Sequence, residues 1–312
     1  MKIAFFTETG YEGKFPRNNP NMRTDAAWIC ALNATHHPIS VIHNIPSNSY
    51  DWGIVIIPKK KDRLVQYPLV ENMKRVCSKV AVMQESTYWY WQDDKIESQV
   101  WYHSVLQSMD LIFCHNDLDV NYYSGITDVR CELLPSLMIT DYIKVFDGER
   151  DGVMLGGNWA SIYRGFDSYM ISKILSTKVT SPTTGRMKEE ERLLDINHLP
   201  WVHWKDWIYE LSKHKYGIQL GTPAAGTFNL NCSYLGIPCI GYNNLNTQKI
   251  LHPNLSVDDG DVSSARKLAE KLKVDPQFYL ENSILTQQLY KENYSEEQFL
   301  IKIKKVLGYE EV

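Results

Sequence analysis

The chain is poor in several features that mark particular classes of protein. Its 312 residues include only six cysteines, and no two of them form a Cys-x-x-Cys pair. Neither a disulfide framework nor the usual thiolate zinc site is therefore expected. The first residues also lack the pattern of a signal peptide, so we expect reduced thiols and a cytoplasmic protein.

Charge and hydrophobicity argue against two further classes. A formal net charge of -4 and a pI near 6.1 do not fit a protein that is basic all over, although a local basic patch could still bind nucleic acid. No apolar run approaches the roughly 18 residues that a membrane span needs, so any membrane contact should be peripheral and not integral. With 44% hydrophobic positions, the chain is long enough for two α/β domains with separate cores.

Apolar runs in the first half alternate with stretches of helical composition. The runs lie at 3–7, 39–44, 52–58, 79–86 and 110–116, and the helical stretches lie at 24–34, 62–77 and 94–108, with Thr24 or Asp25 as the first N-cap. Strands that alternate with helices predict a parallel, doubly wound sheet.

A second cycle of the same kind follows an interruption near residues 138–150. We expect strands at 152–157, 178–183, 216–221, 238–242 and 254–257, and helices at 166–176, 204–214, 227–235, 263–273 and 295–307. Two Rossmann-like halves are the simplest account of this α/β pattern. We place a first domain at 1–145, a second at 146–290 and a C-terminal helix at 291–312.

Glycine is scarce, with 17 in the chain, yet four fall in the segment "GTPAAGTFNLNCSYLGIPCIGY" at 221–242. Ligands of open parallel sheets bind at the carboxyl ends of the strands, where a helix N-terminus supplies free N–H groups and a positive dipole. Gly221 and Gly226 would let a ligand approach the backbone, and Thr227 could cap the helix. A diphosphate is the natural occupant; the alternative is an ordinary tight turn.

The same segment resembles the signature of GT-B glycosyltransferases that use nucleotide sugars. In that family a helix with an acidic residue precedes a small-residue turn and an apolar strand, and the acid binds the ribose hydroxyls. This chain has Asn231 at that position. Asparagine can still accept a hydrogen bond, but it loses the charge-assisted part, worth ~1 kcal/mol.

Other segments resemble the same family in the expected order. "LPWVHWKDWIYELSKHKYGIQLG" is similar to the part that holds the nucleotide base, which implies that Pro200, Trp201 and Val202 meet the base edge with Trp201 or Trp204 beside it; core packing of the tryptophans is the alternative. The segment 109–138 resembles the family's last acceptor-domain strand and linker. The resemblance implies two Rossmann-like domains whose sheets face a central cleft, and a C-terminal helix that crosses back to the first domain.

Sugar transfer needs donors that stabilise the departing diphosphate. Helix N-termini and basic side chains can do this without a metal, so we expect no cofactor beyond the nucleotide diphosphate sugar itself. Any single basic residue could instead be a solvated surface charge. The candidate donor-binding set, with Trp201, Val202 and Asn231, is Gly156, Gly157, Asn158, Arg164, Arg186, Lys188, Gly226, Thr227 and Phe228.

An inverting enzyme also needs a base at the carboxyl edge of the first sheet. Glu85 follows the run 79–84, and its position resembles that of the base in inverting phage DNA glucosyltransferases of this fold. Glu8 and Glu12 are the other candidates. A carboxylate here, where retaining relatives often carry histidine, slightly favours inversion. A helix cap or loop charge is the alternative role for Glu85.

Basic and aromatic residues mark the expected acceptor side. Lys59, Lys60, Lys61 and Arg63 follow the third run, and Arg17 and Arg23 lie in the first long loop. They would suit a polyanionic acceptor, such as DNA with a hydroxymethylated base or a lipid-linked or phosphorylated saccharide. Tyr88 and Trp89 could stack on a sugar or on a flipped base. A solvated lysine loop and a packed aromatic turn are the alternatives.

The combined pattern predicts a metal-independent glycosyltransferase, a hexosyltransferase that moves a sugar from a UDP-sugar to an acceptor hydroxyl. The acceptor is either a glycan or modified DNA. We expect a monomer or weak dimer in the cytoplasm of a bacterial cell, including an infected one. A nucleotide-sugar epimerase of the same fold and a non-catalytic nucleotide-sugar-binding protein stay open as alternatives, the second because Asn231 replaces the family's acid.

Overall fold

The structure is a computed structural model, described for residues 1–8, 10–57, 68–84, 86–92, 94–157, 165–182, 189–221 and 226–308, without the side chains of Tyr90 and Glu190. The chain divides into two compact units. The first contains Met1–Asn19, Arg23–Pro135 and the residues from Phe299 onward. The second contains Pro20–Met22 and Ser136–Gln298.

The first unit is built on a six-stranded sheet in the order β2-β1-β3-β4-β5-β6, in which each neighbouring pair is parallel. The strands are β1 (Ile3–Thr7), β2 (Thr35–Pro38), β3 (Tyr50–Ile57), β4 (Cys77–Gln84), β5 (Leu111–Cys114) and β6 (Cys131–Leu133). The helices are α1 (Thr24–Ala31), α2 (Leu69–Val76), α3 (Tyr88–Trp91), α4 (Ile96–Gln107), α5 (Asp117–Ile126) and most of α12 (Glu296–Leu307). The predicted parallel sheet is therefore confirmed.

The central strands of this sheet are buried along almost their whole length, as expected for a parallel sheet covered on both faces. On α12, Phe299, Ile303 and Leu307 recur every four residues and are all buried. The carbonyl of Leu307 also accepts a hydrogen bond from Nε1 of Trp52 at 3.2 Å. These contacts place the described end of α12 in the first unit.

The prediction of a strand at 39–44 is wrong. The edge strand is the short β2, and Ile39–Asn44 forms the 3₁₀-helix η1. Pro38 ends the strand because it has no N–H for the sheet, and Ile39 and Ile42, three residues apart, are both buried. The Arg75 guanidinium donates to the carbonyls of Ile42, His43 and Ile45, which stabilises the turn after η1.

Two further details of the first unit differ from the predictions. Neither Thr24 nor Asp25 is the N-cap of α1, since the cap position is Arg23 and the Thr24 hydroxyl donates to the Asp25 carboxylate at 3.0 Å. The segment after β5 is also not a simple linker, because it forms α5 and the strand β6. Its polar composition and the glycine at 125 hid this helix, of which only Asp119 and Tyr123 are buried.

The second unit has its own six-stranded sheet, in the order β12-β11-β10-β7-β8-β9 and again parallel. The strands are β7 (Val153–Leu155), β8 (Val179–Pro182), β9 (Asn197–Leu199), β10 (Tyr216–Gln219), β11 (Cys239–Tyr242) and β12 (Ser256–Val257). The helices are α6 (Phe166–Leu175), α7 (Trp204–Leu211), α8 (Thr227–Leu235), α9 (Asn246–Leu251), α10 (Val262–Val274) and α11 (Pro276–Asn293), with 3₁₀-helices η2 (Glu189–Leu193) and η3 (Pro253–Leu255).

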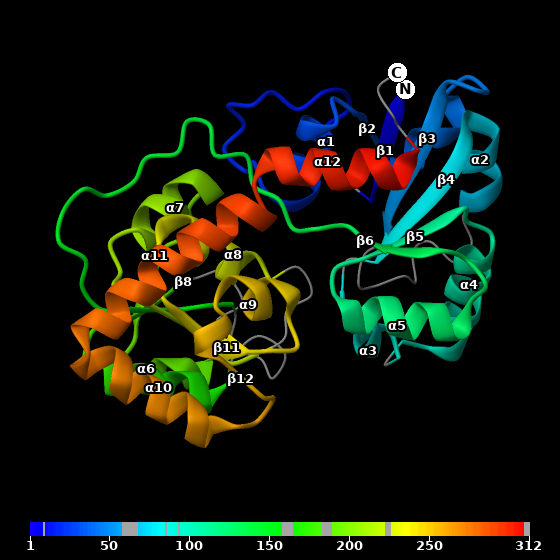
Figure 1. The fold of residues 1–312 in the computed structure, drawn as a ribbon. Helices are drawn as coiled ribbons and strands as arrows, with labels where there is room; N and C mark the ends of the chain where they lie inside the picture. Colours follow the sequence, from blue (N-terminus) through cyan, green and yellow to red (C-terminus); the bar gives the residue numbers. More distant parts are fainter. Residues whose placement is uncertain are drawn as a thin grey trace. The chain divides into compact units, whose positions relative to one another are not determined.

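Helices cover both faces of this second sheet. On one face, α6 and α10 lie side by side and bury Ile171, Leu175 and Ala269 against Val153 and the neighbouring strands (Figure 1). On the other face, α8 packs against α9 and α11. This layering leaves the loops after β7 and β10 at one edge of the sheet, where the candidate site lies.

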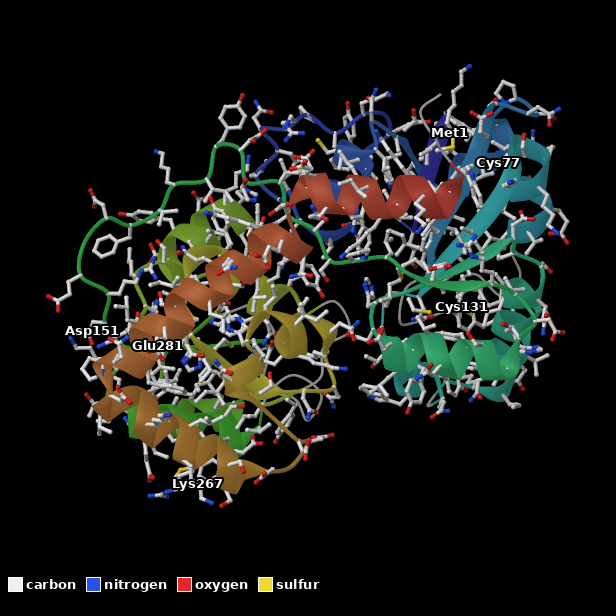
Figure 2. All side chains as sticks on the ribbon, viewed as in Figure 1. Met1, Cys77, Cys131, Asp151, Lys267 and Glu281 are labelled. Atoms are coloured by element: carbon white, nitrogen blue, oxygen red, sulfur yellow. The ribbon has the colours of Figure 1, made fainter. Side chains whose placement is uncertain are left out.

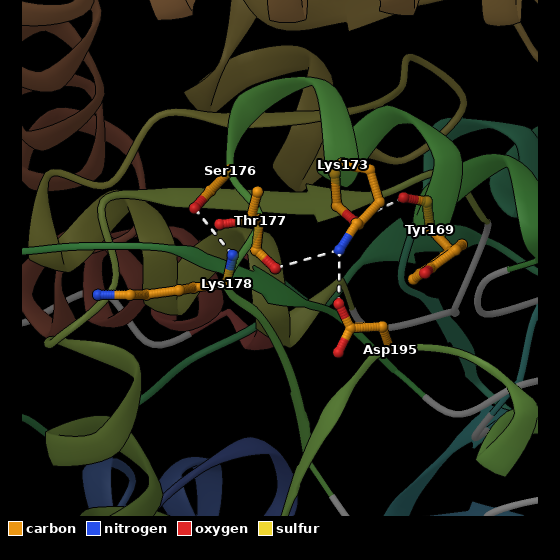
Figure 3. A network of polar contacts seen from close by, with 7 residues as sticks. Tyr169, Lys173, Ser176, Thr177, Lys178 and Asp195 are labelled. Atoms are coloured by element: carbon orange, nitrogen blue, oxygen red, sulfur yellow. Dashed lines mark hydrogen bonds and ion pairs between the residues drawn. The ribbon is translucent and has the colours of Figure 1, made fainter.

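Polar contacts fix the opposite, amino-terminal side of the same unit. Lys173, in the last turn of α6, donates to the carbonyl of Thr177 at 3.1 Å and pairs with Asp195 at 2.9 Å, ahead of β9 (Figure 3). Ser176 accepts from the backbone N–H of Lys178 at 3.0 Å. A cation at a helix C-terminus also interacts favourably with the helix dipole, so these contacts stabilise this end of α6.

All six cysteines are free in this structure. Figure 2 labels two of them, Cys77 at the start of β4 and Cys131 at the start of β6. Burial raises the pKa of the Cys77 thiol to about 12, so this thiol stays protonated and unreactive. None of the helices formed by the described residues is long and apolar enough to cross a membrane.

Candidate functional site

The candidate site lies at the carboxyl edge of the second unit's sheet. β7 and β10 are neighbours, with Leu155 opposite Ile218, so the loops that follow them start side by side. The backbone N–H of Gly156 continues the ladder by donating to the carbonyl of Ile218 at 2.8 Å. Gly157 then turns the chain with φ +72°, a conformation that glycine adopts without strain.

Gly156 is required by close packing of α8 over the end of β7. A Cβ at this position would lie 2.5 Å from Cδ1 of Phe228 and 2.9 Å from Cδ of Gln219. Phe228 is 5% exposed and also packs against Trp207 of α7, with ring centroids 6.2 Å apart. Phe228 thus packs against the end of β7 and helps to set the position of the α8 N-terminus.

The N-terminus of α8 differs from the other long helix starts in the described part of the second unit. Asp261 and Asp275 cap α10 and α11 through the N–H groups of Ser264 and Phe278. In α6, Asp167 accepts from the N–H of Ser168. The cap position of α8 is instead Gly226, with φ +54°, no side-chain cap and no acidic residue in the first turn.

The start of α7 is also occupied. The N–H of Trp204 donates to Oδ1 of Asn21 at 3.1 Å, and the N–H of Lys205 donates to the carbonyl of Pro20 at 3.1 Å. Pro20–Met22 is the short stretch of the early chain that belongs to the second unit. The first long loop therefore caps a helix of the second unit, a role that its polar sequence did not indicate.

The predicted base-binding loop contains two very different tryptophans. Trp201 is 64% exposed and its ring lies 4.9 Å from that of His203, whereas Trp204 is 3% exposed and packs in the core. Val202 is half-buried and Pro200 is exposed. Of the two tryptophans, Trp201 is the one that a nucleobase could contact in this conformation.

Asn231 lies in α8 one turn after Thr227, on the same side of the helix. It is 2% exposed, while Thr227 is half-buried. Two polar residues of α8 close to Asn231 fix the helix to its neighbours. Nδ2 of Asn229 donates to Oε1 of Gln248 at 2.6 Å, and Ser233 donates to the carbonyl of Thr286 at 2.7 Å. Asn231 is therefore buried in a part of α8 whose position these hydrogen bonds fix.

Several predicted donor-binding residues lie outside the described residues: Asn158, Arg164, Arg186 and Lys188. The first two fall in the stretch after β7, and the other two fall in the stretch after β8.

The predicted bases belong to the first unit. Glu85 lies outside the described residues, directly after β4. Glu8 follows β1 and is half-buried. The exposed carboxylate of Glu12 accepts from Nδ1 of His37 at 3.0 Å, and Nε2 of His37 is hydrogen-bonded to the Tyr50 hydroxyl at 2.7 Å. Glu12 is thus already engaged in a short polar chain along the edge strand.

Histidine residues that the sequence analysis did not select lie at this first edge. His36 is 2% exposed; its Nδ1 donates to the carbonyl of Tyr11, so Nε2 accepts from the Thr7 hydroxyl at 2.8 Å. Burial lowers the pKa of His36, and burial lowers that of His115, at the end of β5, to about 4. Both imidazoles are therefore neutral near pH 7.

The predicted acceptor residues fall into two groups. Lys59, Lys60, Lys61 and Arg63 lie outside the described residues, while Arg17 and Arg23 are exposed. Tyr88 and Trp89 form part of α3, and both are half-buried. The ring of Tyr88 stacks on that of Tyr122 with centroids 4.4 Å apart, and the ring of Trp89 meets Tyr88 edge-on at 5.1 Å. One ring face of Tyr88 is thus already covered.

Asp119 holds this aromatic turn in place. Its Oδ1 accepts from the backbone N–H of Tyr88 at 2.8 Å, and its Oδ2 accepts from Nδ2 of Asn116 at 3.2 Å. Burial raises the pKa of Asp119 to about 6, against the effect of these hydrogen bonds. The sequence offered one signal for this residue, an aspartate in the first turn after a strand.

The described residues contain no group of three or more His, Cys, Asp or Glu side chains that could hold a metal ion. The donor set that is visible at the second edge consists of backbone N–H groups, hydroxyls and amides. Such groups recognise anions through hydrogen bonds and helix dipoles.

No protein-family model matches the chain, and no curated protein matches it. Solved structures do match it over nearly its whole length. HepE from Anabaena, in complex with UDP-glucose, has a TM-score of 0.71 at 10% identity, with 99% of each chain covered. Sucrose-phosphate synthase from Thermosynechococcus elongatus also has a TM-score of 0.71, at 8% identity, with 98% of each chain covered.

The chain has the GT-B fold. A third GT-B structure, an α-glucosyltransferase in complex with UDP and a 13-mer DNA, matches with a TM-score of 0.62 at 12% identity and covers 99% of both chains. The chain spans 55% of the length of S. aureus TarM, another structure that it matches. The likeness to these structures confirms the predicted GT-B fold.

Proposed function

We propose that the protein is a glycosyltransferase that moves a sugar from a UDP-sugar to an acceptor hydroxyl. The observation that carries the proposal is the N-terminus of α8, which has Gly226 at its cap position without a side-chain cap and whose Phe228 lies against Gly156 after β7. Its first-turn N–H groups and the helix dipole suit a diphosphate. The resemblance to structures solved with UDP and with UDP-glucose supports the same ligand class.

In this proposal the second unit holds the donor. N–H groups at Gly226 and Thr227 stabilise the charge that develops on the departing diphosphate, together with Arg186 and Lys188 and without a metal ion. Trp201 covers the base, and Asn231 accepts from a ribose hydroxyl. Because additional negative charge develops on the diphosphate only during transfer, donors aimed at the departing oxygen accelerate the reaction itself.

Isothermal titration calorimetry with UDP, with and without EDTA, tests the donor assignment. We expect binding in both conditions. Loss of binding in EDTA would contradict metal-independent recognition, and no binding in either condition would contradict the donor assignment. Incubation with labelled UDP-glucose then separates transfer to an acceptor from conversion to an epimer and from binding without turnover, the outcomes expected of an epimerase and of a non-catalytic binding protein.

In the first unit, Glu85 is the proposed base that takes the proton from the acceptor hydroxyl, which corresponds to an inverting reaction. Glu85→Gln should lower kcat by ~10² or more and leave UDP affinity unchanged, because the lost interaction belongs to the transition state. Glu12→Gln is the matched control, since Glu12 already pairs with His37. A normal kcat for Glu85→Gln together with a reduced kcat for Glu12→Gln would move the base to Glu12.

For the acceptor we propose a glycan or a hydroxymethylated DNA base. One structure with the same fold contains DNA, which supports keeping the second class. If Lys59, Lys60 and Lys61 contact DNA phosphates, affinity should fall with salt at a slope of about -0.9 per contact, and replacing all three by alanine should reduce the slope by up to about three units. Transfer to saccharides alone, with no salt-dependent DNA binding, would eliminate the DNA acceptor.

A further inference from the structure

Thr247, the second residue of α9, has a buried hydroxyl that neither the fold nor the proposed chemistry uses. The residue is 4% exposed, and its Oγ1 has no hydrogen-bond partner among the residues that the structure describes. A buried hydroxyl without a partner destabilises a protein by roughly 1–3 kcal/mol, so such groups are rare in native structures.

The hydroxyl lies against the start of α8. A Cβ built on Gly226 would fall 1.8 Å from Oγ1 of Thr247 and 3.0 Å from its Cβ. Gly226 occupies the cap position of α8, a helix of nine residues with no side-chain cap. Two independent features therefore meet at one point, an uncapped helix N-terminus and an unpartnered hydroxyl from another helix.

The position of α9 is fixed by a buried hydrogen-bond network. Gln248, the residue after Thr247, accepts from Asn229 at 2.6 Å and donates to the carbonyls of Cys239 and Leu255 at 2.9 and 3.2 Å. Ser256 donates to the carbonyl of His252 at 2.8 Å. These hydrogen bonds join α9 to α8, β11 and β12. The backbone of Thr247 is therefore fixed, and its hydroxyl stays beside the start of α8.

We propose that Thr247 is a ligand-binding residue whose hydroxyl donates a hydrogen bond to a phosphate oxygen of the nucleotide diphosphate at the N-terminus of α8. A hydroxyl is a neutral donor, and a phosphate oxygen is a strong acceptor, so the hydrogen bond is charge-assisted. The assignment rests on the proposed function, and it adds a contact from α9 to a diphosphate site otherwise built from α8 and the neighbouring loops.

Thr247→Val and Thr247→Ser test the proposal. Valine keeps the shape and removes the hydroxyl, so UDP should bind about tenfold more weakly while uridine, which lacks phosphates, binds as before. Serine should keep most of the UDP affinity. In thermal unfolding without ligand, Thr247→Val should be as stable as the wild type or more stable, because it removes an unpartnered polar group.

Thr286→Val is the matched control. Thr286 is also buried, at 1% exposed, but its hydroxyl pairs with Nδ1 of His252 at 3.2 Å. This variant should lose stability and keep the UDP affinity of the wild type, the opposite of Thr247→Val. Unchanged UDP affinity in Thr247→Val, or equal weakening of UDP and uridine, would overturn the proposal.

Titration with inorganic pyrophosphate separates this proposal from the proposed function. If the wild type binds pyrophosphate but not UDP, and Thr247→Val loses that binding, the phosphate contact holds and the nucleotide-sugar function fails. If the wild type binds neither, both fail.

Discussion

Buried polar side chains gather at the carboxyl edges of both sheets, but they differ in kind. In the first unit they include titratable groups, namely His36, His115 and Asp119. In the second unit, the described side chains around the start of α8 include neutral amides and hydroxyls, and Oε1 of Gln219 and Oγ1 of Thr247 have no hydrogen-bond partner among the described residues. The titratable groups of the first edge change their protonation with pH, whereas these amides and hydroxyls do not.

Under the proposed function, this difference fits two separate tasks, proton transfer at the first edge and diphosphate binding at the second. An edge that moves a proton benefits from groups whose pKa values burial can shift. An edge that holds a diphosphate of fixed charge benefits from hydrogen-bond donors whose state is the same at every working pH.

The largest effect is expected from Gly226→Ala. The new Cβ would meet Thr247, and alanine is strained at φ +54°, so the start of α8 must shift. UDP affinity should fall by about a hundredfold or more, measured by calorimetry, as the N–H groups lose their alignment. Gly260→Ala is the matched control, since Gly260 has φ +80° but nothing within 4 Å of the new Cβ. Equal losses of UDP affinity in both variants would show that the effect is general strain.

The next effect concerns the pH dependence of stability in the first unit. The pKa of Asp119 is raised to about 6 in the folded state from an ordinary value of 3.8. The folded state then binds more protons than the unfolded state between these values, so the stability contribution of the protonated carboxyl is lost as pH rises through this window.

Asp119→Asn removes this titration. The free energy of unfolding of the variant, relative to the wild type, should rise by about 2 kcal/mol between pH 4.5 and 6.5 in urea denaturation. Asp117→Asn is the matched control because Asp117 is exposed in the same helical turn. A difference between Asp119→Asn and the wild type that does not vary with pH would contradict the contrast between the two edges.

A smaller effect is expected at Asn231 in the second unit. If its amide oxygen accepts from a ribose hydroxyl, the wild type should bind UDP about fivefold more tightly than 2′-deoxy-UDP, a difference of ~1 kcal/mol. Asn231→Ala should bind the two nucleotides equally. Competition between them for the protein measures this preference, and an unchanged preference in the variant would remove Asn231 from the ribose site.

The smallest effect is an expected absence of change. Affinity for UDP-glucose should stay constant within about threefold from pH 6 to 8, because the described polar groups around the start of α8 are neutral and the diphosphate diester keeps its charge. Calorimetry at several pH values gives the answer. A larger change would mean that a titratable side chain takes part in donor binding. It would contradict the statement that the second edge binds the donor through neutral groups.

The sequence predicted regular elements well where local signals agreed. The helix at 227–235 was predicted with the bounds that α8 has, because glycines with left-handed backbone conformations, Gly226 and Gly236, stand at both of its ends. The helix α11 went unrecognised although Asp275 and Pro276 form a clear start signal. The strand predicted at 39–44 failed because an apolar run alone does not separate a strand from a short helix.

The candidate site was predictable only in outline. The glycines at 156, 157 and 226 were selected correctly as the places where strands end and a helix begins. Thr247 was not selected, since nothing in its local sequence separates it from surface residues, and Gln219 was predicted only as part of the strand 216–221. The roles of Trp201 and Trp204 also could not be distinguished, because exposure depends on how α7 packs in the unit.

Apolar periodicity and backbone freedom are local properties of the chain, so the alternation of strands and helices, the parallel sheets and the glycine-rich start of α8 could be predicted from the residues alone. Which side chains meet at the sheet edges could not, because it depends on how the elements pack. The sheet order places β10 between β7 and β11, which brings Phe228 over Gly156 and Thr247 against Gly226. Such contacts join residues far apart in the chain, and they arise only when whole elements pack to bury their apolar faces.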